Sequence, residues 1–310
     1  MSTSQSAVQM KKPNFFIVGA PKCGTSTFMH TLRTHPQAFV PLSFEPHYFS
    51  KDLTSQSGWS PTLEWYEALF EGANESHVAV GEKSVSYLYS TEAVQNILEY
   101  SPDARLVVCL RNPVELIPSW HAEVSFNLRE DETDLEKAWD LQAARREGKH
   151  MPPLNNFGFI LQYREIGLLG KYLQRLYTQV ERDRVHLVFM DDIKADFESV
   201  HAALLAFLGL PHRPPPPRRV YQAHRDHRSK AIAYLLHDQS MTFGARAVRY
   251  FVRNTGTFGK HVLYRAREAN KTKAERKPTT PEFRQKLYET FKDDIALLAQ
   301  LTGRDLSHWR

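Results

Sequence analysis

The 310-residue sequence predicts an α/β fold in which a central parallel β-sheet is flanked by helices in three layers. Short apolar runs alternate along the chain with longer segments of helical periodicity. The runs are continuously apolar instead of alternating, which is typical of parallel strands that are covered on both faces. With 42% apolar residues, the chain can bury a full core of this kind.

Four apolar runs are the expected strands, and they cover residues 14–20, 78–80, 105–110 and 185–190. Helices are expected over residues 26–33, 91–100, 114–124, 135–147, 159–178, 199–208 and 281–301. The last of these has apolar residues at three- and four-residue spacing, which predicts one buried face. These residues are Phe283, Leu287, Phe291, Ile295 and Leu298.

Composition along the chain predicts its domain organisation. Residues 1–12 are polar and are expected to be a disordered leader, without the apolar stretch of a signal peptide. We expect residues 13–310 to form a single domain with an α/β core (13–212), a basic lobe and cofactor loop (213–280) and a C-terminal helix and tail (281–310). No run of about 18 apolar residues occurs, so no transmembrane segment is expected.

Positive charge is concentrated in one part of the chain. The net charge of +5 suits anionic ligands but is too small to indicate nucleic acid. Residues 218–277 hold 15 Lys and Arg against 4 Asp and Glu. This region either lines a site for an acidic acceptor or is a solvated face with some cofactor contacts. Its segment 243–264 mixes aromatic residues with arginines, which also suits peripheral contact with a membrane surface.

The two cysteines, Cys23 and Cys109, are too few for a disulfide framework or a zinc site. They favour a reducing, cytoplasmic location. The sequence contains no cluster of metal-ligand residues, so no metal is expected.

A candidate phosphate-binding loop covers residues 21–27, between the first strand and the first helix, where open α/β sheets bind ligands. Backbone N–H groups and the helix dipole attract an anion there. Gly24 lets the backbone approach a ligand closely, and Lys22 adds a charge. Around them lie Cys23 and the hydroxyls of Thr25, Ser26 and Thr27.

This loop is P-loop-like but is not a Walker A motif, in which the Lys follows the second Gly. Here Lys22 precedes Gly24. An ordinary strand-to-helix turn is one alternative, and a P-loop kinase or other NTPase is another.

A second anion site is predicted after strand 105–110. Arg111 follows this strand, Pro113 suits the first turn of the next helix, and Ser119 lies about two turns along it. An arginine fork and a hydroxyl can together bind a phosphate. Two such sites indicate a nucleotide with phosphates at separate positions.

Both motifs resemble those of sulfotransferases that use 3′-phosphoadenosine 5′-phosphosulfate (PAPS). Lys22-Cys-Gly-Thr-Ser26 resembles the family's 5′-phosphosulfate loop, and Arg111-Asn-Pro-Val-Glu-Leu-Ile-Pro-Ser119 resembles its 3′-phosphate motif. The match is to the carbohydrate and heparan-sulfate type and its bacterial relatives. It covers residues 15–210 and roughly the last thirty. The resemblance implies a single sulfotransferase domain with PAPS as co-substrate.

The resemblance also implies further site residues. Segment 44–49 resembles the stretch with the family's catalytic carboxylate, here Glu45, and segment 82–84 resembles its substrate segment, here with Lys83. A basic loop before the last helix would touch the cofactor, with Lys273, Arg276 and Lys277 as candidates. The chain departs from the family pattern at Asn112, where an Asp is common, at Ser50, where heparan-sulfate members carry a nearby acid, and in lacking a disulfide-closed loop.

In the expected in-line transfer, Lys22 and the loop amides stabilise the leaving oxygen. Glu45 would act as the base with His47 beside it, on the same side if the segment is extended. Alternatively, Glu45 is a surface acid. His121 is a rival base or a packed histidine, and Lys83 orients the acceptor or the sulfate, or is a solvent-exposed lysine. The acceptor would be a sugar, lipid or small metabolite. A catalytically inactive PAPS-binding module is the remaining alternative.

Overall fold

The computed structural model describes most of the chain, and the described residues are 11–42, 45–54, 59–155, 157–217, 225–237, 243–273 and 278–310. The predicted leader therefore lies almost entirely outside them. The chain divides into two compact units. The first comprises Met1–Leu116, Arg164–Arg219 and Gln285–Arg310, and the second comprises Ile117–Tyr163 and Val220–Arg284. The predicted subdivision at residues 212 and 280 stays a prediction.

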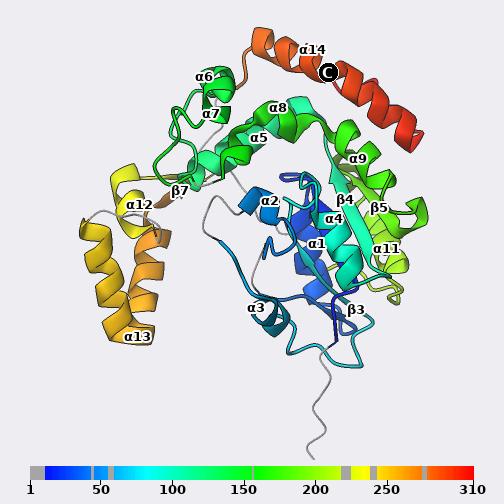
Figure 1. Cartoon of the computed structure of the whole chain (residues 1–310), viewed down its shortest axis with the longest axis horizontal. Coiled ribbons are helices and arrows are strands. Elements are labelled where there is room, and N and C mark those ends of the chain that lie inside the picture. The colour runs from blue at the N-terminus through cyan, green and yellow to red at the C-terminus, as the bar shows by residue number, and fades with distance from the viewer. Residues whose placement is uncertain are drawn as a thin grey trace, which may run out of the picture. The chain divides into compact units, whose positions relative to one another are not determined.

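The first unit contains a five-stranded parallel sheet with the order β2-β3-β1-β4-β5. Three of these strands, β3, β4 and β5, are labelled in Figure 1. Its strands are β1 (Phe15–Gly19), β2 (Ala38–Phe39), β3 (Ala79–Lys83), β4 (Arg105–Leu110) and β5 (Val185–Phe189). Every residue of β1 is buried, as expected for a central strand with helices on both faces. The predicted fold class is confirmed. The two-residue strand β2 was not predicted because it is too short to show a pattern.

Strand β3 differs from its prediction over residues 78–80. It begins at Ala79 and continues through Gly81, Glu82 and Lys83, all of them buried. A Cβ on Gly81 would lie 2.3 Å from the carbonyl oxygen of Phe15, so only glycine allows this close pairing. The prediction ended too early because an apolar pattern does not detect charged residues whose partners lie elsewhere in the fold.

The helices of the first unit are α1 (Thr25–Arg33), α2 (Lys51–Thr54), α3 (Leu63–Ala68), α4 (Ala93–Tyr100), α8 (Tyr163–Gly167, which starts at the end of the second unit), α9 (Leu169–Tyr177), α10 (Met190–Ala195), α11 (Phe197–Phe207) and most of α14 (Pro281–Thr302), with a 3₁₀ turn at Arg182–Arg184. Helix α1 packs against β2 and β3, and α10 and α11 pack against β5. This arrangement places the turn between β1 and α1 at the carboxyl end of the sheet, where the ligand site was predicted.

The single helix predicted over residues 159–178 is wrong. The segment forms a 3₁₀ turn (Gly158–Leu161) followed by α8 and α9. A Cβ on Gly167 would lie 2.3 Å from the ring of Phe291 in α14. The carboxylate of Asp294 accepts the N–H groups of Gly170 and Lys171, each at 2.7 Å, and so replaces the carbonyls of a continuous helix. A distant helix thus sets this break.

The second unit is mainly helical. It holds most of α5 (Pro113–Phe126), then α6 (Leu135–Asp140), α7 (Gln142–Arg146), α12 (Lys230–Leu236) and α13 (Phe243–Ala269), with an antiparallel pair of strands, β6 (Arg225–His227) and β7 (Lys271–Lys273). The helix predicted over residues 135–147 is two helices that meet at Leu141. Helix α5 begins at Pro113, as predicted. Of the helices described here, none is long and apolar enough to cross a bilayer.

Candidate functional site

The loop between β1 and α1 has a backbone suited to bind an anion. Lys22 and Gly24 have left-handed φ angles of 59° and 89°, and Gly24 is the N-cap residue of α1. A Cβ on Gly24 would lie 2.8 Å from Cδ1 of Ile193, so the packing of α10 also requires glycine here. No side chain of the described residues caps this helix; the N–H of Thr27 donates to the carbonyl oxygen of Gly24 at 3.0 Å, and the amides before it can face an anion.

The thiol of Cys23 does not face the loop opening. It is fully buried, and its Sγ donates to the carbonyl oxygen of Pro21 at 3.2 Å. Burial raises its pKa to about 12, although Arg111 and Lys22 act in the opposite direction. The Cys23 side chain therefore anchors the loop, and only its backbone amide is left for a ligand.

Arg111 contacts the phosphate loop directly. Its Nη1 donates to the carbonyl oxygen of Lys22 at 3.1 Å, and its Nη2 lies 3.9 Å from Oε2 of Glu115. Its buried Nε has no hydrogen-bond partner among the described residues. A guanidinium N–H without a protein partner can bind an anion. The two predicted anion-binding segments therefore meet at one edge of the sheet.

Asn112, which replaces the family's common Asp, has a local structural role. Its Oδ1 accepts the N–H of Val114 at 2.9 Å, in the first turn of α5. An amide oxygen can cap a helix as well as a carboxylate can. The departure therefore leaves the start of α5 intact.

Thr25 and Thr27 lie in α1, whereas two other predicted cofactor residues, Ser119 and Lys273, belong to the second unit. Ser119 is buried on α5, and Lys273 is the last residue of β7. Arg276 and Lys277 lie outside the described residues. The joint action of Ser119 with Arg111, and a cofactor contact from any of the three basic residues, stay predictions.

Lys83 connects the phosphate loop to the predicted base. It is the last residue of β3, and its side chain is only 4% exposed. Its Nζ lies 2.7 Å from Oε1 of Glu45 and donates to Oγ of Ser26 at 3.1 Å. The alternative of a solvent-exposed lysine is therefore wrong. Since β3 pairs with β1, the sheet itself brings Lys83 beside the loop.

Glu45 and His47 come together by a different geometry from the one expected. Their φ angles are 60° and 53°, so the segment is not extended. Nevertheless, Nε2 of His47 lies 3.4 Å from Oε2 of Glu45. The N–H of His47 donates to Oγ of Ser84 at 2.9 Å, and its Nδ1 lies 2.7 Å from Oγ of Ser86. These bonds hold a left-handed backbone that costs about 1–3 kcal/mol at each residue.

The electrostatics of this cluster favour an ionised Glu45 and a neutral His47. Burial by itself raises the pKa of Glu45, but the charge of Lys83, then His47 and hydrogen bonds, bring this pKa below its ordinary value. Burial lowers the pKa of His47, against the opposing effect of Glu45. Glu45 is 27% exposed and ion-paired, so it is not a free surface acid. It is a carboxylate that can accept a proton at neutral pH.

Comparison with known proteins shows to which family the chain belongs. The family described as "Sulfotransferase domain" matches residues 12–234. The chain belongs to this family.

Individual relatives match parts of this sulfotransferase-family chain. Human heparan sulfate glucosamine 3-O-sulfotransferase 6 is 36% identical over 111 residues, which are 36% of this chain and 30% of that protein. Mouse heparan sulfate glucosamine 3-O-sulfotransferase 3A1 is 32% identical over 102 residues, which are 33% of this chain and 24% of that protein. The matches thus span less than a third of these curated relatives.

A solved structure matches over almost the whole length. The crystal structure of a sulfotransferase from Alicyclobacillus acidocaldarius is 25% identical, with a TM-score of 0.69, and the match covers 97% of this chain and 99% of that one. The family and the α/β fold are therefore as predicted.

Glu82 is a buried residue of this sulfotransferase-family chain that sequence reasoning missed. Its carboxyl accepts from Oγ of Ser84 at 2.9 Å and from the hydroxyl of Tyr87 at 2.7 Å. Burial raises its pKa to about 7. Because Ser84 also accepts the N–H of His47, Glu82 helps to hold the backbone of His47 through Ser84.

Two serines, Ser50 and Ser86, lie next to His47. Oγ of Ser50 lies 2.7 Å from Oγ of Ser86, which contacts the His47 ring. Hydroxyl groups therefore surround this side of the His47 ring. The spacing of Ser84 and Ser86 after Lys83 was a signal that the sequence contained.

The rival base His121 is a packed histidine, as the alternative prediction stated. It is buried in the second unit, with Nε2 2.9 Å from the carbonyl oxygen of Glu132. Burial lowers its pKa. Within the part of the chain that the structure describes, no group of three or more His, Cys, Asp or Glu residues is placed to hold a metal ion.

Proposed function

We propose that this sulfotransferase-family chain transfers the sulfuryl group of PAPS to an acceptor hydroxyl or amine. One observation carries the proposal. Lys83 contacts both Glu45 and Ser26, and so joins a partly exposed carboxylate to the phosphate loop within one compact unit. Family membership supports a sulfotransferase enzyme with PAPS as its sulfate donor.

In the proposed complex, the amides of residues 22–27 and the Lys22 side chain bind the phosphosulfate. Arg111 and Ser119 bind the 3′-phosphate, and Lys273, Arg276 or Lys277 adds a contact. The Nε of Arg111, which lacks a partner among the described residues, supports its role as a phosphate ligand.

In the proposed reaction, the acceptor oxygen or nitrogen attacks sulfur in line and passes its proton to Glu45. The bond between sulfur and the phosphate oxygen breaks, and 3′-phosphoadenosine 5′-phosphate leaves. Lys22 and the loop amides offset the charge on that oxygen. His47 positions Glu45, and Lys83 orients the acceptor or the sulfuryl group. A metal is not required in this scheme, because a sulfuryl group carries less charge than a phosphoryl group.

A carbohydrate is the proposed acceptor class, ahead of a lipid or small metabolite. Two relatives are named for heparan sulfate glucosamine, which supports this choice. A cytoplasmic location is also part of the proposal. It is supported by two free, buried cysteines, which suit a reducing compartment.

Calorimetric titration with 3′-phosphoadenosine 5′-phosphate and with ATP plus Mg²⁺ tests the nucleotide. We expect the former to bind at least about 100-fold more tightly, because ATP lacks the 3′-phosphate and forgoes its charge-assisted contacts. The opposite preference would indicate a kinase or other NTPase. Transfer of radiolabelled sulfate from PAPS to a library of sugars, lipids and small hydroxy compounds then tests catalysis. Nucleotide binding with no transfer to any acceptor would favour an inactive binding module.

A further inference from the structure

Exposed apolar side chains are concentrated on two helices of the second unit. Twelve large hydrophobic residues of the described chain are exposed, and eight of them lie on α12 and α13. These eight are Ile232, Leu235, Phe243, Tyr250, Phe251, Phe258, Val262 and Tyr264. Phe243 is 88% exposed and Phe258 is 64% exposed. A cluster of this kind marks an interaction surface.

Helix α13 is a hairpin of two helical legs (Figure 1, yellow to orange). Gly256 interrupts it with φ 57° and ψ −124°. A Cβ on Gly259 would lie 2.8 Å from Cα of Val252, so the two legs touch beside the turn. The first leg packs on α12, where a Cβ on Gly244 would lie 2.5 Å from Leu235. The hairpin is thus held by packing contacts between its legs and with α12, while its aromatic side chains are exposed to solvent.

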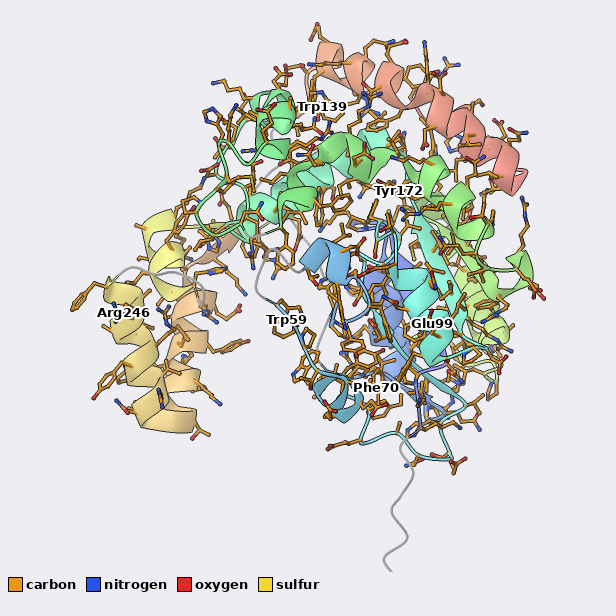
Figure 2. All side chains as sticks on the ribbon, viewed as in Figure 1. Trp59, Phe70, Glu99, Trp139, Tyr172 and Arg246 are labelled. Atoms are coloured by element: carbon orange, nitrogen blue, oxygen red, sulfur yellow. The ribbon has the colours of Figure 1, made fainter. Side chains whose placement is uncertain are left out.

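The hairpin is also strongly basic. Residues 243–269 contain six Arg or Lys and a single acid, Glu268. Arg246 lies on the first leg (Figure 2), between Phe243 and Tyr250 on the same side of the helix by its three- and four-residue spacing. Aromatic and basic side chains therefore share one exposed face.

We propose that the α13 hairpin docks on an anionic phospholipid surface. Phe243, Phe258 and Val262 would enter the boundary between head groups and acyl chains, and the arginines would bind lipid phosphates. A second copy of this chain is a poorer partner, because it would bring two basic faces together. An anionic polymer would bind the arginines but would leave the exposed phenylalanines without an apolar partner. The inference goes beyond the proposed transfer reaction and does not depend on it.

Vesicle sedimentation of the full chain tests the proposal. We expect binding to phosphatidylcholine vesicles that contain phosphatidylglycerol, little binding to phosphatidylcholine alone, and weaker binding as salt rises. The triple variant Arg246→Gln, Arg249→Gln, Arg253→Gln should lose about 100-fold in affinity, at about fivefold per basic residue. The double variant Phe243→Ser, Phe258→Ser should lose at least about tenfold.

Control variants remove three positive charges, or two exposed apolar side chains, elsewhere in the chain. They are Lys149→Gln, Lys194→Gln and Arg213→Gln together, and Leu63→Ser with Val78→Ser, all at exposed positions. Both controls should bind vesicles as the wild type does. Circular dichroism melting checks each variant. The single change Phe258→Ser replaces the serine variant, and Arg246→Gln replaces the arginine variant, if either melts early.

Three results would overturn the proposal. The first is that the wild type binds neither kind of vesicle, or that the control variants lose as much vesicle affinity as the hairpin variants do. The second is full binding by the Phe243→Ser, Phe258→Ser variant with loss only in the arginine variant, which would indicate a site for an anionic polymer. The third is a concentration-dependent dimer, by light scattering, that this serine variant abolishes. Sulfate transfer to a water-soluble acceptor is measured alongside, so that loss of the proposed activity is recognised separately.

Discussion

Each compact unit contains a pair of a carboxylate and a cation, and the two pairs differ in how completely they are enclosed. Glu130 and Arg145 in the second unit have side chains that are 0% exposed and form two bonds, at 2.5 and 2.6 Å. Glu130 also accepts the hydroxyl of Tyr163 at 2.6 Å. In the first unit, Lys83 makes a 2.7 Å contact with Glu45, whose side chain is 27% exposed. Similar residue types thus occupy a closed site and an open one.

This difference separates a structural pair from a candidate catalytic pair. Every strong acceptor position of Glu130 is used within the protein, so no capacity remains for a substrate. Glu45 keeps an exposed side and lies on a left-handed backbone that Glu82, through Ser84, helps to hold. Strain and an open face at a carboxylate are typical of functional sites. The predictions below test this distinction.

The largest expected effect is on turnover. Glu45→Gln should lower kcat by about 10³-fold, because it removes the proposed proton acceptor, while affinity for 3′-phosphoadenosine 5′-phosphate changes by less than about twofold. Radiolabelled-sulfate transfer and calorimetry measure the two quantities. Glu64→Gln, at an exposed carboxyl on α3, is the control and should behave as the wild type. Normal turnover with weakened nucleotide binding would contradict the assignment.

The next effect is on stability. Arg145→Met leaves the Glu130 charge buried without its partner and should lower the free energy of unfolding by about 3–5 kcal/mol. Lys83→Met should lower the free energy of unfolding by less than half of this amount, because water can solvate the unpaired charge of Glu45. Urea denaturation measures both. Equal destabilisation of the two variants would show that the exposure of Glu45 does not make its pair with Lys83 less important for stability than the pair of Glu130 and Arg145.

A smaller effect is expected in the titration of Glu45. Lys83 lowers the pKa of Glu45, so the stabilisation from this pair is present above the ordinary pKa of a glutamate and is lost as pH falls through the lower folded value. Lys83→Met should therefore move the Glu45 titration to higher pH. Carboxyl-carbon NMR follows this titration directly, because Lys83 itself belongs to the proposed site. An unchanged midpoint would show that Lys83 does not control Glu45.

The smallest effect concerns Glu82, whose pKa burial raises from 4.5 to about 7. A raised pKa means that the fold favours the protonated form, so this contribution is complete below pH about 4.5 and is lost as pH rises through about 7. Glu82→Gln should flatten the dependence of the urea midpoint on pH across that interval. The same slope in wild type and variant would mean that Glu82 does not titrate there.

Much of the site was predictable because it depends on order along the chain. Carboxyl ends of parallel strands lie at one edge of a sheet, and so the loop after β1 and Arg111 after β4 had to meet. The 3.1 Å bond from Arg111 to the Lys22 carbonyl shows that they do. His47 lies beside Glu45 as predicted, but on a left-handed backbone instead of the extended one that was assumed.

The sequence by itself determined the family, the α/β class and the segments that could bind phosphate, because apolar periodicity and loop motifs are local properties. Only the tertiary structure decided that β3 carries Glu82 and Lys83 into the core, that Asp294 caps the start of a helix 124 positions earlier in the chain, and that Glu130 is enclosed while Glu45 is open. The physical reason is that the cost of burying a charge depends on the number of its partners. Those partners come from residues far away in sequence.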